Sequence, residues 1–374
     1  MVEQISMITD IERILRESPA EPVKNIARLL KSHKTVVNPI LYGNPHIFSV
    51  DTDRFWSLVS PEKIRVRLME EAWVDCKSFE QALATAGSPL DFKCTEVEFV
   101  LPVGCKLMID AAARVLALCN QLTFLGKSVA IDLTDCSKTR TYLNRLGFFD
   151  HLNSEVRVLP RRPSRSAAEA YRGNNDGVIE LAVIHHQVPD ESIPKRFKKS
   201  LVTFAGERYE ASFTFISELF GNVRDHAQSQ IPGFAALQYY PRSKKVQTVI
   251  SDSGVGIVGS LMPVLATRHP EVFQSLDLSA PDLGPQLLLQ IFKRGRISRS
   301  EDDARGLGLK VSGEVAAKFD ATVTIRQQNF ELILVYEKTR LITDHRLNLP
   351  SILGTHICVE FLIDSEETLV KLRK

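Results

Sequence analysis

The sequence predicts an α+β protein in which a small α/β layer precedes a larger C-terminal domain of strands and helices. Residues 95–147 follow the order strand, helix, strand, helix, which is the order of a small α/β layer. Residues 207–227 carry apolar side chains at helical spacing, and strand patterns at 246–250 and 354–361 follow them. Hydrophobic residues make up 44% and charged residues 25% of the 374, a composition ordinary for a globular protein.

We expect four segments along the chain, with bounds at 1–60, 61–160, 161–199 and 200–374. The first is helical and irregular, and Pro19 and Pro22 divide its helical pattern into two pieces. The second is a regulatory α/β domain that opens on a helix over 61–73, with proline in its first turn. The third is a linker, basic over 161–166, with a strand at 178–184. The fourth carries the ligand-binding pattern described below.

The α/β layer consists of four predicted elements. Residues 95–101 alternate like a strand, and 105–125 form an apolar helix that ends at a glycine. Residues 128–133 form a short buried strand, and 140–147 a short helix that stops at a second glycine. This arrangement resembles the STAS regulatory domain, although other α/β domains fit the same pattern.

Charge and cysteine usage give no sign of a nucleic-acid, membrane or zinc partner. Lys and Arg number 47 against 45 Asp and Glu, so the net charge of +2 does not indicate nucleic acid or a membrane surface. The N-terminus lacks the basic flank and apolar run of a signal peptide, and no stretch is long enough to span a bilayer. We therefore expect a cytoplasmic protein. The six cysteines lack C-x-x-C spacing, which predicts buried reduced thiols and no zinc site.

The helix predicted over 207–227 places three polar residues on neighbouring positions of one face. Glu218, Asn222 and Asp225 stand at i, i+4 and i+7. The amide oxygen of Asn222 is a hard ligand suited to Mg²⁺. The carboxylate of Glu218 can orient or deprotonate a water that attacks a phosphoryl group. A solvent-facing polar helix produces the same spacing, so this pattern alone does not decide the function.

Two glycine-containing turns follow this helix. Asp252 ends a strand, where it can accept a hydrogen bond from an exocyclic amine, and Gly254 and Gly256 let the backbone approach a flat ring. An ordinary glycine turn after a strand is the alternative. The second turn leads into a helix N-terminus, a place that favours phosphate, and comprises Arg305, Gly306, Leu307, Gly308, Leu309 and Lys310. Thr355 lies near the start of the last predicted strand.

In this order the pieces resemble the GHKL ATP-binding fold of gyrase B, the ninety-kilodalton heat-shock chaperones, histidine kinases and MutL. The resemblance spans about 200–364 and implies a sandwich in which helices cover a mixed sheet, with ATP and Mg²⁺ as ligands. It implies that Glu218 and Asn222 form the N box, and that Asn222 holds the metal. Asp225 also matches the pattern of gyrase and the chaperones.

The resemblance assigns the remaining residues to the nucleotide. Asp252 binds adenine within the first glycine box, and Thr355 supports adenine through water. Gly306 and Gly308 form the second glycine box beside the phosphates. The basic residue that contacts the γ-phosphate stays open among Lys293, Arg294, Arg296, Arg299, Arg305 and Lys310.

The function that follows is a Mg²⁺-dependent ATPase that acts as a conformational switch. ATP would close a lid at about 258–303, and hydrolysis would open it. We expect ATP and ADP as ligands and a protein partner or client that responds to the N-terminal half, and leave a homodimer open. One alternative is a serine/threonine protein kinase of the anti-sigma-factor type, which pairs with STAS partners. The other is a non-hydrolysing, ATP-gated binding module.

Overall fold

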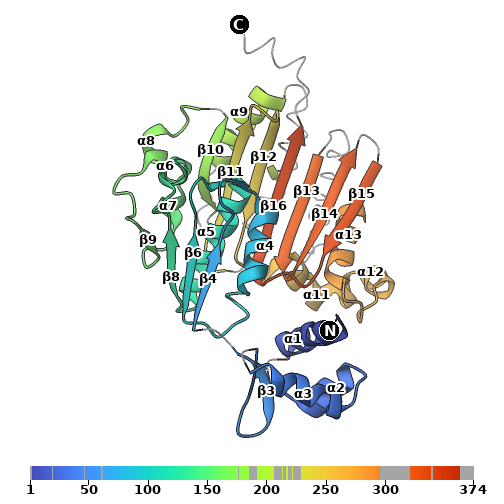
Figure 1. Ribbon diagram of the computed structural model, residues 1–374. Coiled ribbons are helices and arrows are strands. Elements are labelled where there is room, and N and C mark those ends of the chain that lie inside the picture. The colour runs from blue at the N-terminus through green and yellow to red at the C-terminus, as the bar shows by residue number, and fades with distance from the viewer. Residues whose placement is uncertain are drawn as a thin grey trace. The chain divides into compact units, whose positions relative to one another are not determined.

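The structure is a computed structural model that describes residues 2–18, 20–45, 47–59, 62–175, 177–184, 192–205, 229–294, 321–337 and 340–362, with Phe213, Ile216, Ser217 and Gly221. The chain forms two compact units, one of Met1–Lys63 with Asp91–Cys94 and one of Ile64–Leu90 with Thr95–Lys374. Both helices and strands are present, and the sheets include parallel and antiparallel pairs, so the coarse α+β class is confirmed (Figure 1). No described helix is both long and apolar enough to cross a bilayer.

The first unit packs three helices with a three-stranded sheet of order β1-β3-β2. Its elements are α1 (Val2–Glu17), β1 (Glu21–Pro22), α2 (Val23–Leu29), α3 (Lys34–Gly43), β2 (Phe48–Val50) and β3 (Phe55–Leu58). The predicted break of the helical region is confirmed, because α1 ends before Pro19 and α2 begins after Pro22. The helix α3 was not predicted. Val37, Ile40 and Leu41 are buried at helical spacing, and their burial outweighs the unfavourable Pro39 inside the helix.

The second unit begins with a four-stranded sheet of order β4-β6-β8-β9. Its strands are β4 (Lys63–Arg67), β6 (Glu96–Val100), β8 (Ser128–Asp132) and β9 (Arg157–Leu159). The β6–β8 and β8–β9 pairs are parallel. The accompanying helices are α4 (Cys76–Ala86), α5 (Ile109–Phe124), α6 (Ser137–Leu146), α7 (Phe148–His151) and α8 (Ala167–Tyr171), and β5 (Trp73–Val74) pairs with β7 (Lys106–Leu107). The strand–helix–strand–helix pattern predicted for this region is confirmed.

The helix predicted over 61–73 is wrong, because this stretch contains β4. Burial alternates along Lys63–Arg67, with Ile64 and Val66 inside and the basic residues outside. That period of two, with β-branched residues on the buried side, is the pattern of a half-buried strand. The proline at 61 suggested a helix start, but the alternation that follows it decides the structure.

A seven-stranded sheet forms the centre of the second unit. Its strands are β10 (Val178–Ile184), β11 (Gly233–Tyr240), β12 (Lys245–Ser251), β13 (Ala321–Gln328), β14 (Phe330–Glu337), β15 (Arg340–Arg346) and β16 (Ile352–Leu362). The order is β10-β11-β12-β16-β13-β14-β15, so the last strand lies between β12 and β13. Every pair in this sheet is antiparallel, which differs from the mixed sheet expected here.

Helices cover both faces of the seven-stranded sheet. On one face, α5 contacts β11, β12 and β16, and it also contacts β8 of the parallel sheet (Figure 1). All its residues from Ile109 to Thr123 are buried, as expected for a helix enclosed between two sheets. The α/β layer and the large sheet therefore belong to one unit, which takes in the expected segments 161–199 and 200–374 and most of 61–160.

The other face of the sheet carries α9 (Ser192–Ala205), α11 (Gly256–Arg268), α12 (Pro270–Ser275) and α13 (Leu283–Arg294). Leu261, Leu265, Leu288 and Ile291 from these helices join the hydrophobic core of the sheet. The described part of the lid expected at 258–303 therefore packs against the sheet, and its closure over a nucleotide stays a prediction. Residues 295–303 lie outside the described residues.

The six cysteines are free thiols, and all except the half-buried Cys76 are fully buried. This agrees with the expected reduced, buried thiols. Burial raises the pKa of the Cys105 thiol to about 12, so it stays protonated and unreactive at neutral pH. Within the described part of the chain, His, Cys, Asp and Glu form no cluster that could hold a metal ion.

Candidate functional site

The candidate site begins where β12 ends, at Asp252. This residue is 5% exposed, and its backbone N–H donates to the carbonyl of Thr355 at 2.9 Å. Its side-chain Oδ1 accepts a hydrogen bond from the Gly254 N–H at 2.7 Å, which closes a tight turn. The strand end thus holds a buried carboxylate in a defined orientation beside β16. Two of the residues predicted for adenine, Asp252 and Thr355, are therefore neighbours, while their role stays a prediction.

A glycine in β16 makes this close approach possible. Between Thr355, which pairs with Gln327, and Ile352, which pairs with Gln328, two extra residues bulge from β16. One of them, Gly354, has φ +89°, and a β-carbon there would lie 2.1 Å from the carbonyl oxygen of Asp252. Only glycine fits this position, both for its backbone angle and for the space. Nothing in the sequence alone assigns Gly354 to the site.

Gln327 links the threonine to the helix after the glycine turn. Its Nε2 donates to Thr355 Oγ1 at 2.9 Å, and its Oε1 accepts from the Val258 N–H at 3.2 Å. Gly256 begins α11 with φ +74°, and a β-carbon there would approach the Gln327 amide to 3.3 Å. Hydrogen bonds therefore link Asp252, Thr355, Gln327 and Val258, and Gly256 lies against the amide of Gln327.

The remaining predicted site residues lie outside the described residues. These are Glu218, Asn222, Asp225, Arg305, Gly306, Leu307, Gly308, Leu309 and Lys310. Of the helix predicted over 207–227, the described residues Phe213, Ile216, Ser217 and Gly221 are helical. Ile216 is buried in the core of the sheet and Phe213 packs against it, as the predicted apolar stripe requires. Among the γ-phosphate candidates, Lys293 and Arg294 end α13.

Two buried hydroxyls in the described part of the chain lack a hydrogen-bond partner, Ser217 Oγ and Thr248 Oγ1. Thr248 lies between Val246 and Ile250 on the same side of β12, and both of these neighbours belong to the core on the α11 face. Ser217 directly precedes Glu218 in the chain. Unpaired buried hydroxyls are rare, and they indicate places where a water or a ligand completes the bonding.

The helix α5 holds the candidate site from the opposite face of the sheet. Gln121 is fully buried, and its Nε2 donates to Ser253 Oγ and to the Leu353 carbonyl, both at 2.9 Å. Its Oε1 accepts from the Leu353 N–H at 3.0 Å. One amide of the α/β layer therefore binds both the turn after Asp252 and the bulge before Thr355. The sequence carried no signal for Gln121, because a polar residue inside an apolar helix has no fixed partner until the helix is packed.

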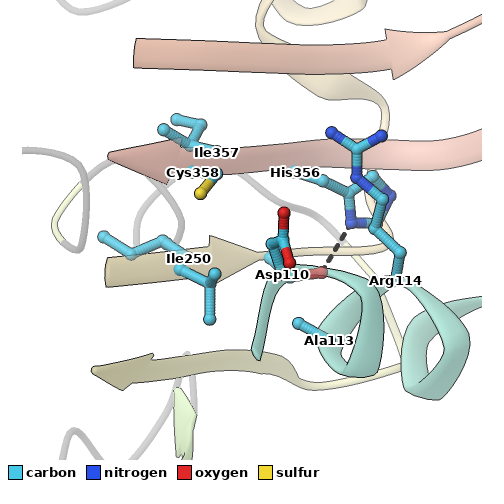
Figure 2. Close-up of a pocket in the computed structure, with 9 residues that line it drawn as sticks. Asp110, Ala113, Arg114, Ile250, His356, Ile357 and Cys358 are labelled. Carbon is cyan, nitrogen blue, oxygen red and sulfur yellow. Dashed lines mark hydrogen bonds between the residues drawn. The ribbon is translucent and has the colours of Figure 1, made fainter. Parts of the chain in front are cut away.

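A small cavity with both polar and apolar lining residues lies between α5, β12 and β16. Its volume is about 10 Å³, close to the smallest space that holds one water. Figure 2 shows Asp110, Ala113 and Arg114 of α5 facing His356 and Cys358 of β16. Burial raises the pKa of Asp110, which favours its neutral form in this cavity.

His356 is held as a neutral imidazole in this region. The carbonyl of Leu353, 3.0 Å away, can only accept, so Nε2 carries the hydrogen. Nδ1 then accepts from the Ser251 hydroxyl at 2.6 Å. Burial first, and then the charges of Arg114 and Arg326, lower the pKa of His356 from 6.5 to about 3. The imidazole therefore has a structural role and does not serve as a base for proton transfer near pH 7.

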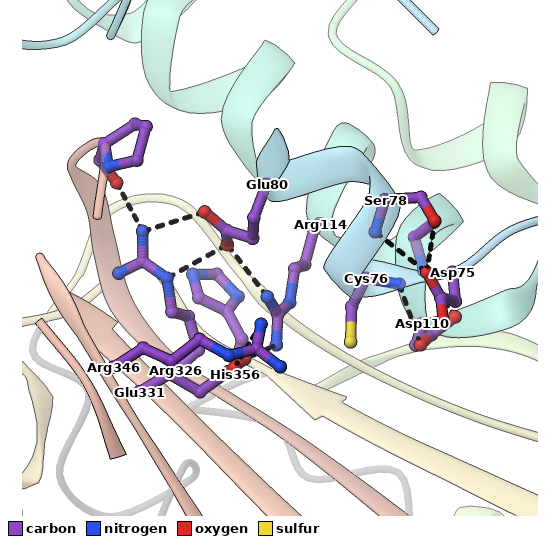
Figure 3. A network of polar contacts seen from close by, with 12 residues as sticks. Asp75, Cys76, Ser78, Glu80, Asp110, Arg114, Arg326, Glu331, Arg346 and His356 are labelled. Atoms are coloured by element: carbon purple, nitrogen blue, oxygen red, sulfur yellow. Dashed lines mark hydrogen bonds and ion pairs between the residues drawn. The ribbon is translucent and has the colours of Figure 1, made fainter. Parts of the chain in front are cut away.

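A buried ion network joins α4 and α5 to the large sheet (Figure 3). Glu80 of α4 accepts from Arg114 of α5 at 2.8 Å and from Arg326 Nε of β13 at 2.9 Å. Arg114 also donates to Glu331 of β14 at 2.9 Å, and Arg346 of β15 pairs with the same carboxylate at 3.2 Å. Because each charge is paired, the network fixes how the α/β layer sits on the sheet.

We predict that His356 makes the stability of the fold depend on pH. The unfolded chain takes up this proton near pH 6.5, whereas the folded protein does so only near pH 3, so the unfolded state binds more protons between these values. The free energy of unfolding therefore falls as the pH falls through this window. Between pH 7 and 4, urea unfolding of the wild type should lose on the order of 2–3 kcal/mol more than His356→Gln. An equal loss in both proteins would contradict the assignment.

A scan of the chain against models of known protein families gives no match, and a search of the curated proteins gives none either.

Proposed function

We propose that this chain is a Mg²⁺-dependent ATP-binding protein of the GHKL type, and that it acts as an ATPase whose nucleotide state switches a partner protein. The observation that carries the proposal is the position of Asp252. A buried carboxylate at a strand end, oriented by the Gly254 N–H and backed by Thr355, suits an exocyclic amine such as that of adenine. The resemblance of the sequence assigned this role to the same two residues.

The surroundings of Asp252 support a flat, polar ligand on the α11 face. Gly256 begins α11 without a side chain, so its backbone can lie close to a ring. Farther along the same side of β12, the unpaired hydroxyl of Thr248 is a buried polar atom that a water or a ligand could bond. Asn222 would hold the Mg²⁺ ion, which neutralises charge on the phosphates when bound. Glu218 would position the water, and the turn over 305–310 would receive the phosphates at a helix N-terminus.

The switch has a physical route through Gln121. This residue belongs to α5 of the α/β layer and hydrogen-bonds both loops that flank the adenine position. A ligand that moves Ser253 or Leu353 must therefore act on α5, and a partner that moves α5 must act on the nucleotide. We propose that the α/β layer transmits the nucleotide state in this way.

A second candidate function is a serine/threonine protein kinase of the anti-sigma-factor type. The parallel β6-β8-β9 sheet, with α5 and α6, favours this candidate because it keeps the strand–helix order that resembles STAS domains. In such a kinase Glu218 would activate a protein hydroxyl in place of water. Transfer of label from γ-labelled ATP to a protein would favour it over the ATPase.

We expect Asp252→Asn to weaken ATP binding about 10-fold or more, because the amide loses the charge that strengthens the bond to an amine. The variant keeps the size of the side chain. Asp277→Asn is a matched control, since Asp277 accepts from the N–H two residues on at 2.9 Å in the same kind of turn, but at an exposed position. Equilibrium binding of ATP with Mg²⁺ measures both, and equal affinities in the two variants would contradict an adenine contact.

Turnover separates the ATPase from a binding module. Phosphate release should be lost in Glu218→Ala while ATP binding is retained, and Asn222→Ala should lose binding of ATP with Mg²⁺. Unchanged turnover in Glu218→Ala would remove this residue as the group that acts on water. If the wild type binds ATP but releases no phosphate, with or without its partner, the ATPase is replaced by an ATP-gated binding module.

A further inference from the structure

A polar pocket lies on the outer side of the α/β layer, and none of the described residues assigned to adenine lines it. Its volume is about 390 Å³, and it is formed by α6 and by the segment that follows β9. These two parts are neighbours at the left edge of Figure 1, between β9 and α8. The polar side chains that line it include Arg140, Thr141, Asn144, Arg161, Arg162 and Arg165.

Four guanidinium groups line this pocket, and no carboxylate does. Arg140, Arg161 and Arg165 form no ion pair with any described residue. Arg162 donates to the carbonyls of Leu152, Asn153 and Val156, which carry no charge. The other partly or fully buried arginines of this unit are different, because each pairs with a glutamate: Arg114, Arg145, Arg196, Arg326 and Arg346. Positive charge is therefore concentrated here without an internal partner.

Hydrogen bonds hold the pocket in shape, including those of the basic stretch over 161–166 that the sequence predicts to be a linker. Arg162 binds the turn before β9 through its three carbonyl contacts. Asn144 donates to the Arg165 carbonyl at 3.2 Å and accepts from the Ala167 N–H at 3.3 Å. Ser166 caps α8 by accepting from the Glu169 N–H at 2.9 Å. Gathering like charges in a fixed concave site costs free energy, and a bound anion would offset that cost.

The chemistry and the size of the pocket select the class of anion. Guanidinium groups match the oxygens of phosphate in a two-pronged geometry, and Thr141 and Asn144 add uncharged polar groups. A volume of about 390 Å³ falls in the range of small-molecule sites. No aromatic side chain lines the pocket on which a base of single-stranded nucleic acid could stack. These features favour a compact ligand over a polymer.

We propose that this pocket binds a small phosphate-bearing molecule with at least two negative charges. The site is independent of the proposed ATP site. Its helix α6 is joined to the large sheet, because Arg145 pairs with Glu180 of β10 and the Tyr142 hydroxyl donates to Gln238 of β11 at 2.6 Å. A ligand that draws Arg140 and Arg161 together would thus act on the edge of the sheet that carries the nucleotide site.

Calorimetric titration of the full chain with inorganic pyrophosphate at about 150 mM salt tests the proposal, because salt at this level screens loose surface charge. We expect the double variant Arg140→Gln/Arg161→Gln to weaken binding at least 10-fold. The matched double variant Arg157→Gln/Arg172→Gln removes the same charge from exposed positions outside the pocket and should stay within twofold of the wild type. Thermal unfolding midpoints of the three proteins confirm that each is folded.

Three results would overturn the proposal. The first is failure of the wild type to bind pyrophosphate. The second is equal weakening in both double variants, because binding would then be due to total charge. The third is an oligonucleotide that binds through these arginines while pyrophosphate does not, which would mark a polymer surface. Repeating the titration in Asp252→Asn with Asn222→Ala separates the two sites. If the Asp252→Asn/Asn222→Ala protein has lost ATP binding but still shows the difference in pyrophosphate affinity caused by the arginine substitutions, the pocket proposal holds even if the ATPase proposal fails.

Discussion

Replacing Gly354 with alanine is expected to destabilise the protein by about 4 kcal/mol or more and to abolish ATP binding. The new β-carbon would lie 2.1 Å from the carbonyl oxygen of Asp252 and 2.7 Å from the Ser253 α-carbon. These are backbone atoms, and hydrogen bonds hold them in place. The Asp252 N–H donates to the Thr355 carbonyl, and the Asp252 carboxylate accepts from the Gly254 N–H. The bulge and the turn would have to separate, and the carboxylate would lose its orientation. Urea unfolding and equilibrium ATP binding measure the two effects.

Gly126→Ala is the matched control for the steric argument. Gly126 has φ +78°, similar to the +89° of Gly354, but nothing lies within 4 Å of the position its β-carbon would take. Replacing Gly126 with alanine should therefore lower the free energy of unfolding only by the backbone strain of a left-handed residue, about 1–2 kcal/mol. If the two variants lost equal stability, the close approach of Gly354 to Asp252 would have no energetic role.

Replacing Glu80 with glutamine is expected to lower the free energy of unfolding by about 3–5 kcal/mol. Glu80 is 3% exposed and pairs with both Arg114 and Arg326, which are buried as well. Without its charge, Arg326 would lose its ion pair, and Arg114 would keep only the carboxylate of Glu331, which it shares with Arg346. An unpaired charge in the interior is costly because it loses water without gaining a partner.

Glu98→Gln provides the control for this network. The Glu98 side chain is also nearly buried, but its ion-pair partner Arg65 is 64% exposed and lies 3.1 Å away. Water screens that pair, so the same chemical change should cost no more than about 1 kcal/mol. Chemical unfolding of both variants decides the comparison. A small loss in Glu80→Gln, similar to that of the control, would show that the network does not fix the α/β layer on the sheet.

Part of the candidate site could be predicted because its residues are local in the chain. Asp252, Gly254 and Gly256 lie within five positions, and a strand followed by glycines predicts a turn whatever surrounds it. Gln327 and Gln121 could not be predicted. They reach Thr355 and Ser253 from 28 and 132 positions away, and only the pairing of β13 with β16 and the packing of α5 bring them there.

The sequence by itself determined the local elements whose periodicity is strong and unbroken. The strands β6, β8, β10 and β12 and the helices α5 and α6 follow from apolar spacing and from glycines that stop the helices. Where local cues conflicted, burial decided: β4 formed in place of a predicted helix because its alternation buries Ile64 and Val66 in a strand beside β6, and α3 formed despite Pro39.

Only the tertiary structure decided that the α/β layer and the large sheet form one unit with α5 between them. A helix with apolar residues on all sides is predicted to be covered, but the sequence does not show which elements cover it, since hydrophobic association has no direction. The partners of Glu80, Arg114, Arg326 and Glu331 are likewise set by long-range contacts and not by spacing. The chemistry of individual residues could therefore be predicted from the sequence, whereas the packing and ion pairs that connect the α/β layer to the large sheet exist only in the folded molecule.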